Sequence, residues 1–185
     1  MTRFRHLTRG GTYLRVADPA WVRPLDPSYA MGRGGRWNPP GSFPVVYLCA
    51  TVDVARANVL QRFTGAPYGV LDLQPERRPD LVRTRVPEGR TVDVVTDLGC
   101  RAAGLPASYP FDGRGRRIGW RRTQPIGLAA WDAGERAIAC RSAALPRGER
   151  GEELAWFARE RGRPRVTARR SFDDWFGVTD ASPDG

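Results

Sequence analysis

The fold is decided by residues 34–60, which read GGRWNPPGSFPVVYLCATVDVARANVL. The glycines at the start permit backbone angles and close approaches that a Cβ would forbid, and two adjacent prolines stiffen the loop that follows. Residues 44–50 (PVVYLCA) form a short apolar run rich in β-formers, which predicts a buried strand. Thr51 suits the N-cap of a helix from Val52 to about Phe63. The segment therefore predicts a shaped loop, a strand and a helix in direct succession.

The chain before this segment predicts one strand and one long loop. A basic leader is expected to precede a strand at residues 12–17, on which Arg15 shares a face with Tyr13 and Ala17 because side chains alternate along a strand. Residues 18–33 carry three prolines together with Trp21 and Tyr29, so we expect an irregular loop there rather than a helix. Arg15 is then either a solvated strand residue or part of a site.

The chain after residue 60 predicts further short elements. Apolar runs bounded by turn residues indicate strands at residues 68–73, 80–86, 91–95 and 137–141, and a closing pair at 153–158 and 164–169. Capping residues indicate a short helix at residues 97–104 and a longer one that Thr123 caps and that runs to about Ala133. The strand at residues 137–141 would deliver Ser142.

These elements predict one mixed α+β domain of short strands with two to three helices. No repeat or linker divides the chain, and its 185 residues are typical of one domain. We expect the domain to span residues 1–176 and to end in a short aromatic segment. Residues 177–185 are expected to form a loose tail.

The basic residues are numerous but scattered. The chain has a formal charge of +10 at pH 7 and contains no lysine. Such a charge is typical of proteins with polyanionic partners. Because the arginines are spread along the chain without a recognised nucleic-acid motif, we expect that nucleic acid is not the primary ligand. Residues 112–122 hold five arginines, and they form either a phosphate-attracting loop or a solvated flexible one.

The cysteines and the histidine of the chain do not suggest a metal site or a histidine-based triad. Cys49, Cys100 and Cys140 lie far apart without metal-ligand spacing, so we expect buried thiols in a reducing compartment. His6 is the single histidine, so neither a histidine-based triad nor a multi-histidine metal site can form. The start of the chain has no apolar signal core, and no apolar run could cross a bilayer. We therefore expect a cytoplasmic protein without a membrane partner.

Several motifs occur in an order that resembles the RES-domain family, which is named for its arginine, glutamate and serine. They are Tyr13-Leu14-Arg15-Val16, Gly35-Arg36-Trp37-Asn38, the apolar strand with Tyr47, the alanine-rich helix after it, and Cys140-Arg141-Ser142-Ala143. The resemblance implies a fold similar to that of ADP-ribosyltransferases and a toxin that degrades NAD+ or transfers ADP-ribose. It also implies a helix-turn-helix antitoxin as partner. NAD+ would be the substrate, and no further cofactor is required.

The resemblance implies that Arg15, Arg36, Tyr47 and Ser142 bind NAD+, and that Arg36, Asn58 and Ser142 take part in catalysis. These residue types suit the task. Guanidinium groups match the oxygens of a pyrophosphate, Tyr47 offers an aromatic face with a polar tip, and Ser142 can donate or accept toward the ribose or the nicotinamide amide. The same side chains also have structural interpretations as loop anchor, core residue and turn cap. For Trp37 we expect a packing role rather than a stacking contact with a ligand.

Asn58 departs from the family pattern, because the glutamate of the family would fall at this position of the helix. An amide can hydrogen-bond a ribose hydroxyl, but it carries no charge to offset an oxocarbenium ion and cannot act as a base at neutral pH. Losing one well-placed electrostatic contribution typically costs about 2.7–4 kcal/mol, a factor of roughly 100–1,000 in rate.

Two functions therefore stay open. One is an enzyme, weakened at Asn58, that cleaves the nicotinamide–ribose bond of NAD+ by hydrolysis, phosphorolysis or ADP-ribosyl transfer. The other is a catalytically silent domain that binds NAD+ or a related nucleotide. The resemblance favours the enzyme.

Overall fold

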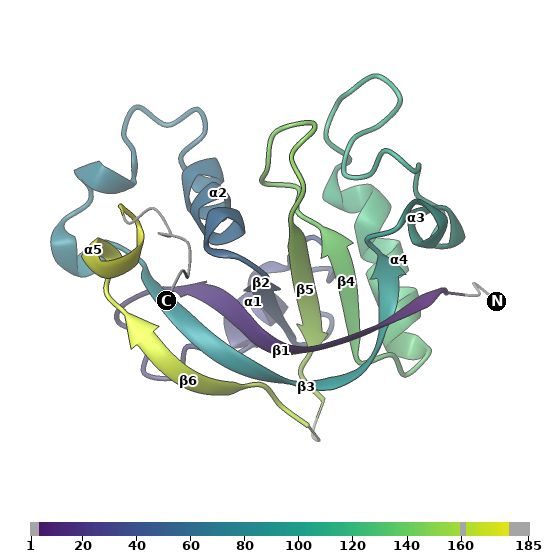
Figure 1. Cartoon of the computed structure of the whole chain (residues 1–185), viewed down its shortest axis with the longest axis horizontal. Coiled ribbons are helices and arrows are strands. Elements are labelled where there is room, and N and C mark those ends of the chain that lie inside the picture. The colour runs from purple at the N-terminus through teal and green to yellow at the C-terminus, as the bar shows by residue number, and fades with distance from the viewer. Residues whose placement is uncertain (1–3, 160–161, 178–185) are drawn as a thin grey trace, which may run out of the picture.

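Two long strands carry the fold in the computed structural model, which describes residues 4–159 and 162–177. Strand β1 (His6–Ala17) and strand β3 (Asp80–Val94) pair antiparallel along nearly their whole length and curve beneath the other elements (Figure 1). Their register shifts at a bulge between Arg9 and Gly11. A bulge bends a strand and increases its twist, so the ribbon can curve around the rest of the sheet.

The remaining strands close a ring of pairings on this ribbon. Strand β2 (Val45–Cys49) pairs with β1 and with β5 (Glu152–Phe157), and β5 pairs with β4 (Ala137–Arg141), all antiparallel. Strand β4 lies parallel to the end of β3, which completes the ring. Strand β6 (Arg165–Arg170) pairs with the first part of β3 outside the ring. Strand β5 is thus a central strand with a neighbour on each side.

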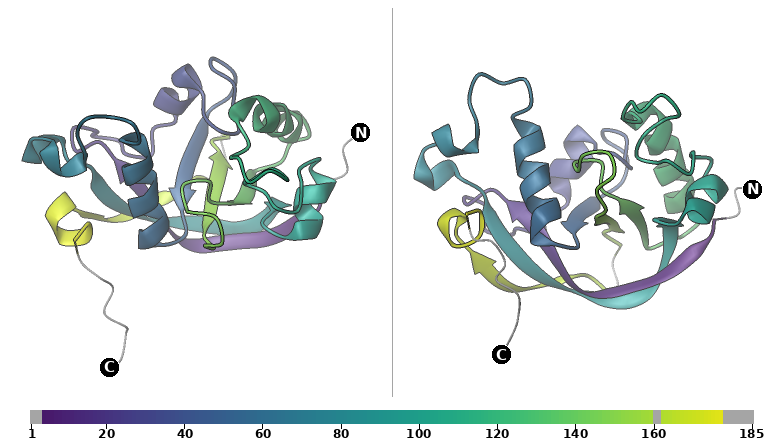
Figure 2. Two further views of the ribbon diagram at one scale, coloured as in Figure 1. Left: turned by 90° about the horizontal axis from the view of Figure 1, so that it is seen from above. Right: turned by 45° about the horizontal axis from the view of Figure 1, so that its top comes forward.

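Four of the α-helices of the described residues lie toward the two ends of the ribbon (Figure 2). Helices α2 (Val52–Arg62) and α5 (Phe172–Trp175) lie toward one end, and α3 (Asp97–Ala102) and α4 (Trp120–Asp132) toward the other (Figure 2). The short helix α1 (Ser28–Arg33) leads into the loop that begins at Gly34, which we call the glycine loop.

Three hydrophobic clusters hold these elements together. One surrounds the fully buried Trp37 and joins α3 and α4 to the sheet. A second packs α2 and α5 against β1 and β3 around Val59 and Trp175. The third lies between β1, β2, β4 and β5 and contains Leu154 and Trp156. The predicted packing role of Trp37 is therefore confirmed.

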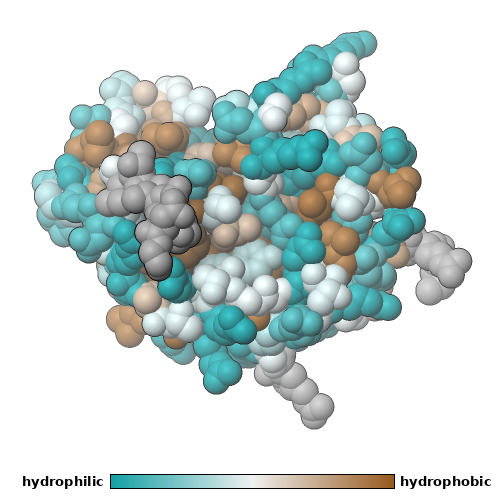
Figure 3. Space-filling view, viewed as in Figure 1, coloured by the Kyte–Doolittle hydropathy of each residue, from teal (hydrophilic) through white to brown (hydrophobic). Residues whose placement is uncertain are grey.

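The face of the molecule in Figure 3 is mostly hydrophilic. The face seen in Figure 3 mixes hydrophilic residues with small hydrophobic groups. Arg114, Arg116, Arg121 and Arg122 are exposed, in agreement with the solvated interpretation of residues 112–122. Within residues 4–159 and 162–177, no helix has the length and apolar character needed to cross a membrane.

The segment quoted at the outset forms the elements predicted for it. Strand β2 and helix α2 lie where the apolar run and the cap indicate, and the Thr51 hydroxyl accepts a hydrogen bond from the Val54 N–H at 3.3 Å. Strand β4 also forms as predicted and is followed directly by Ser142. The predicted mixed α+β fold class is confirmed.

Three strand predictions are wrong, each because a distant partner overrides the local pattern. Strand β3 is continuous where two strands were expected, since Pro87 and Glu88 form a bulge in β3 opposite Gly10, and Gly89 pairs with Arg9. The first strand begins at His6 rather than Thr12, because β3 is long enough to pair with it. Strands β5 and β6 do not pair with each other, because β6 lies on β3.

Local hydrogen bonds explain other differences. Residues 68–73 contain a 3₁₀ turn (Val70–Asp72) instead of a strand, because the Asp72 carboxylate accepts a hydrogen bond from the Gly69 N–H at 2.7 Å. The predicted loop at residues 18–33 ends in α1. Helix α4 begins at Trp120, and Thr123, expected as its cap, is buried inside it.

The number and length of the elements also differ from the prediction. Five α-helices occur in the part of the chain that the structure describes, against two to three predicted. Strands β1 and β3 have 12 and 15 residues and are not short. The predicted tail lies outside the described residues except for Gly177.

Helix α4 packs on the glycine loop through a very close backbone contact. A Cβ on Gly127 would lie 1.7 Å from the carbonyl oxygen of Trp37, so only glycine fits there. From the same helix, the Thr123 hydroxyl donates to the carbonyl oxygen of Arg36, and Gln124 Nε2 donates to that of Gly35 at 3.0 Å. A helix distant in sequence therefore fixes the glycine loop.

We predict that Gly127→Ala destabilises the protein. Overpacking of a core typically costs about 1–3 kcal/mol, and here the obstructing atom is backbone, which outweighs the roughly 1 kcal/mol by which alanine favours a helix. Chemical denaturation followed by tryptophan fluorescence measures the difference. Gly113→Ala is the control, because a Cβ there meets nothing within 4 Å. Equal stability of the two variants would contradict the prediction.

Candidate functional site

A cavity of about 280 Å³ lies between β1, β2, helix α2 and the glycine loop. Its volume is near the lower end of the roughly 300–1,000 Å³ typical of small-molecule sites, so it can enclose part of a large ligand. Ser142 does not line it, but the Ser142 hydroxyl donates to Glu153, which does. The other four residues predicted for the site do line it: Arg15, Arg36, Tyr47 and Asn58.

Arg15 is a buried cation without an acidic partner. The residue is 7% exposed, its Nη1 has no hydrogen-bond partner among the described residues, and its Nη2 reaches the carbonyl oxygen of Asp26 only at 3.4 Å. Burial, and then the nearby Arg62, lowers the pKa of the guanidinium from 12.5 to about 10, so it remains charged at neutral pH. That lowering corresponds to about 3 kcal/mol against the charged form. A buried charge of this kind indicates an anionic ligand.

The polar lining of the cavity is mainly cationic. Arg36 and Arg62 line it beside Arg15, and none of these arginines forms an ion pair within the described ranges. Glu153 is the one carboxylate among the described lining residues. The aromatic residues Trp21, Tyr29 and Trp120 also line the cavity. Excess positive charge beside aromatic surface suits an anionic ligand that carries rings.

Arg36 combines a lining position with an anchoring contact. Its Nη1 donates to the carbonyl oxygen of Ile118 at 3.0 Å, which ties the glycine loop to the segment before α4. The side chain is partly buried and still lines the cavity. The geometry therefore fits both the ligand-binding and the loop-anchoring interpretations of this residue.

The hydroxyl of Tyr47 is fully engaged inside the protein. It accepts a hydrogen bond from the Trp37 N–H at 2.9 Å and donates to Asn38 Oδ1 at 2.7 Å. Burial raises the pKa of this phenol well above its usual value, so it stays neutral. Gly35 allows this approach, since a Cβ there would lie 2.5 Å from the hydroxyl oxygen. Tyr47 can offer its ring to a ligand, while its polar tip holds the glycine loop.

Asn58, Glu153 and Ser142 form one hydrogen-bonded group. Asn58 Nδ2 donates to Glu153 Oε1 at 3.0 Å, and Ser142 Oγ donates to the same oxygen at 2.6 Å. Asn58 Nδ2 also reaches the carbonyl oxygen of Val54 at 3.1 Å. The second carboxylate oxygen, Glu153 Oε2, accepts no hydrogen bond from the described residues. The group joins helix α2, the start of β5 and the end of β4.

Glu153 was not predicted from the sequence as a site residue. A signal for it exists, because Glu152 and Glu153 are consecutive at the start of an apolar strand and must face opposite sides. Glu152 bonds to Arg9 at 2.8 Å and to the Tyr13 hydroxyl at 2.9 Å, whereas Glu153 faces the cavity. Arg62 was also missed, although it follows Asn58 by one helical turn.

Cys49 lies beside this group but is unsuited to act as a nucleophile. Its Sγ is 3.5 Å from Asn58 Nδ2. Burial raises the pKa of the thiol well above its usual value, so the reactive thiolate does not form at neutral pH. Cys100 and Cys140 are also buried and free, which confirms the prediction of buried thiols.

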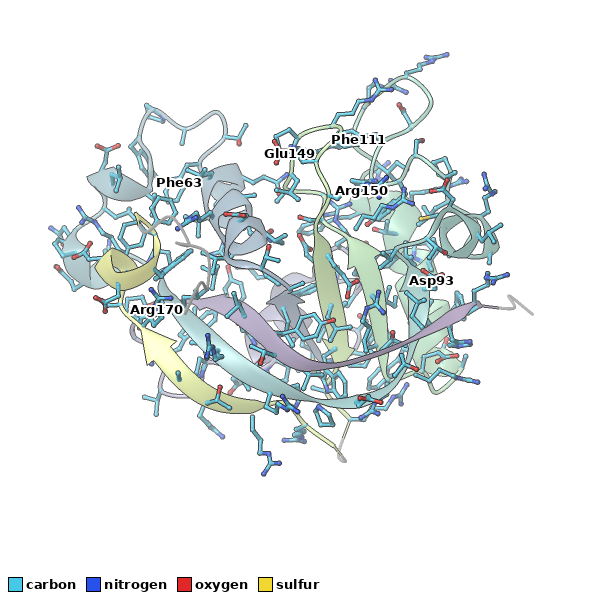
Figure 4. The ribbon with its side chains drawn as sticks, viewed as in Figure 1. Phe63, Asp93, Phe111, Glu149, Arg150 and Arg170 are labelled. Atoms are coloured by element: carbon cyan, nitrogen blue, oxygen red, sulfur yellow. The ribbon has the colours of Figure 1, made fainter. Side chains whose placement is uncertain are left out.

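A larger hollow of about 750 Å³ lies beyond the end of β4, and Phe111, Glu149 and Arg150 border it (Figure 4). Of the three arginines that line it, the partly buried Arg141 is already neutralised, because Nη2 lies 2.5 Å from Asp97 Oδ1 and the other nitrogens donate to backbone carbonyls. Glu149 and Arg150 are exposed to solvent. The smaller cavity, with its buried unpaired charge, is therefore the better candidate site.

The fold and the cavity define a mixed α+β domain whose curved sheet holds an arginine-lined pocket. A family model described as the RES domain matches residues 12–173. The chain therefore belongs to the RES-domain family, and the resemblance inferred from its motifs is confirmed.

One solved structure gives a further comparison. A chain in the crystal structure of the M. tuberculosis MbcT–MbcA toxin–antitoxin complex matches with a TM-score of 0.73 and 21% identity, covering 94% of this chain and 92% of that chain. At this level of identity the likeness shows a shared fold. Comparison of the sequence with curated proteins gave no significant match.

We predict that Tyr47→Phe lowers stability although it removes a single oxygen atom. The substitution leaves the Trp37 N–H and Asn38 Oδ1 buried without this partner, and each unsatisfied group typically costs about 1–3 kcal/mol. Urea unfolding measures the loss. Tyr68→Phe is the matched control, since Tyr68 is 52% exposed. A Tyr47→Phe protein as stable as the control would show that the hydroxyl is dispensable.

Proposed function

We propose that the chain binds NAD+ in the arginine-lined cavity and cleaves the bond between nicotinamide and ribose. The observation that carries this proposal is the Arg15 guanidinium, which is buried, charged and without an acidic partner among the described residues. A folded protein retains such a charge at a free-energy cost, and an anionic ligand offsets that cost.

The lining residues match the parts of NAD+. Arg15, Arg36 and Arg62 can bind the pyrophosphate oxygens through their planar guanidinium forks. The rings of Trp21 and Tyr47 can contact a base or the nicotinamide. The cavity is too small to enclose the whole dinucleotide, so we expect the adenosine end to extend toward solvent.

The reaction is a heterolytic cleavage. The C1′–N bond breaks, both electrons leave with the nicotinamide nitrogen, and an oxocarbenium-like ribose remains. A nucleophile then attacks C1′. With water, the products are nicotinamide, ADP-ribose and one proton. Phosphate or a protein side chain as acceptor would give phosphorolysis or ADP-ribosyl transfer. The protein requires no further cofactor in this scheme.

Family membership and the structural comparison support a toxin role. The compared structure is described as a toxin–antitoxin complex. By analogy we propose that this chain acts in the cytoplasm as an ADP-ribosyltransferase-like toxin and that a helix-turn-helix antitoxin binds it.

A second function, a catalytically silent NAD+-binding domain, is favoured by one observation. Helix α2 presents the amide of Asn58 where the family resemblance places a glutamate. This alternative requires tight binding of NAD+ without release of nicotinamide.

The deciding experiment incubates the purified chain with NAD+, with and without phosphate, and follows free nicotinamide, while calorimetry measures binding. Release above the buffer rate supports the enzyme. Binding without release supports the silent domain. If the wild type releases nothing and Asn58→Glu does, the natural site is inactivated at that residue. Neither binding nor release would overturn both functions.

We predict that Arg15→Met has opposite effects on stability and on binding. The free protein becomes more stable, by on the order of 1–3 kcal/mol, because an unpaired buried charge is removed. Affinity for NAD+ falls about 10- to 100-fold, because a charge-assisted hydrogen bond is lost. Denaturation and calorimetry measure the two effects.

Arg83→Met provides the control for this prediction. Arg83 is an exposed arginine on the neighbouring strand β3, opposite Leu14 of β1. Both quantities should stay close to wild type in the control. Loss of stability in Arg15→Met, with unchanged affinity, would show that Arg15 is structural.

A further inference from the structure

We propose that Glu153, on strand β5, supplies the carboxylate that stabilises the ribose cation, and that Asn58 positions it. This inference rests on the proposed cleavage of NAD+. It assigns the catalytic charge to a strand residue in place of the helix residue that the family pattern indicates.

Glu153 lies within hydrogen-bonding distance of the position where the family's glutamate would stand. Asn58 Nδ2 is 3.0 Å from Glu153 Oε1, so the amide and the carboxylate share one wall of the cavity. A carboxylate that enters the cavity from β5 can therefore reach nearly the same space as one that enters from α2. Within the described lining, no other carboxylate competes for this role.

Among the described residues, the carboxylate of Glu153 accepts hydrogen bonds from neutral groups alone. Its hydrogen-bond donors are the neutral amide of Asn58 and the neutral hydroxyl of Ser142, both on Oε1. None of the ion pairs of the described residues includes Glu153. A carboxylate with one occupied and one free oxygen, bordering a cavity, is available to a developing cation.

The backbone beneath Glu153 is held firmly. Strand β5 pairs with β2 on one side and β4 on the other, where Glu153 lies opposite Cys49 and Cys140. Asn58 and Ser142 then fix the carboxylate from two different elements. A charge held on a central strand undergoes little reorganisation when the reaction creates its partner, which is the condition for electrostatic catalysis.

Asn58 and Ser142 are positioning residues in this arrangement. Asn58 donates a hydrogen bond that orients the carboxylate, and Ser142 does the same from the position directly after β4. In hydrolysis, Glu153 stabilises C1′ as nicotinamide leaves with the bonding electron pair. It can then accept a proton from the attacking water and release it to solvent, which leaves ADP-ribose.

The test compares nicotinamide release by the full chain and two variants. Glu153→Gln keeps the shape and removes the charge. The double variant Asn58→Glu/Glu153→Gln exchanges amide and carboxylate across the hydrogen bond, so the charge returns from the helix side. We expect Glu153→Gln to lower kcat about 100- to 1,000-fold, with KM and the calorimetric Kd for NAD+ little changed. The exchanged variant should regain much of the lost kcat.

A matched control and the unfolding midpoint separate charge from structure. Glu152→Gln changes the neighbouring carboxylate, which faces Arg9 and Tyr13, and should leave kcat close to wild type. If Glu153→Gln fails to fold, the exchanged variant decides, because it keeps the amide–carboxylate pair.

The possible outcomes distinguish this inference from the proposed function. An active wild type with an equally active Glu153→Gln overturns the role of Glu153 alone. The role of Glu153 is also overturned if Glu153→Gln loses stability and NAD+ affinity in parallel with kcat. It is overturned as well if the exchanged variant regains none of the lost kcat. A wild type that releases no nicotinamide overturns the proposed cleavage, and the role of Glu153 with it.

Discussion

Hydrogen bonds of the Tyr47 hydroxyl connect the glycine loop to the sheet, and the shape of the cavity depends on them. The phenol accepts from the Trp37 N–H and donates to Asn38, whose side-chain amide donates to the carbonyl oxygen of Ala30 at 2.7 Å. One side chain of β2 thus fixes both the loop that carries Arg36 and the end of α1. The net contribution of such bonds is modest, about 1 kcal/mol each, but burying their partners unbonded costs more. The loop is therefore held in one conformation.

The parts of the fold that the sequence predicts are those fixed by local chemistry. Thr51 caps α2 with its own hydroxyl, and the apolar run before it forms β2. The predictions that are wrong concern elements that depend on contacts between distant segments. Pro87 and Gly89 interrupt the local pattern, yet β3 continues because Pro87 lies in a bulge of β3 opposite Gly10 and Gly89 pairs with Arg9. Thr123 is a good cap by residue type, but it lies inside α4, where its hydroxyl donates a hydrogen bond to the carbonyl oxygen of Arg36. No local pattern contains that information.

The residues of the candidate site were likewise predicted only in part. Arg15, Arg36, Tyr47 and Asn58 were predicted from ordered motifs and line one cavity. Glu153 was not, because its significance depends on a strand pairing that brings β5 between β2 and β4. The motif comparison shows that the helix has Asn58 where a carboxylate is expected. The tertiary structure places the carboxylate of Glu153 next to Asn58. The substitution at position 58 is therefore incomplete evidence for loss of activity.

The unpaired guanidinium of Arg15 links the stability of the fold to its ligand. A molecule that neutralises this charge binds the folded chain and not the unfolded one, so it shifts the folding equilibrium by mass action. Under the proposed function the neutralising group is the pyrophosphate, which cleavage of the nicotinamide–ribose bond leaves intact in ADP-ribose. Substrate and product of hydrolysis would then both stabilise the folded chain. The resistance of the chain to proteases would follow the sum of the two nucleotides and would persist after NAD+ is spent.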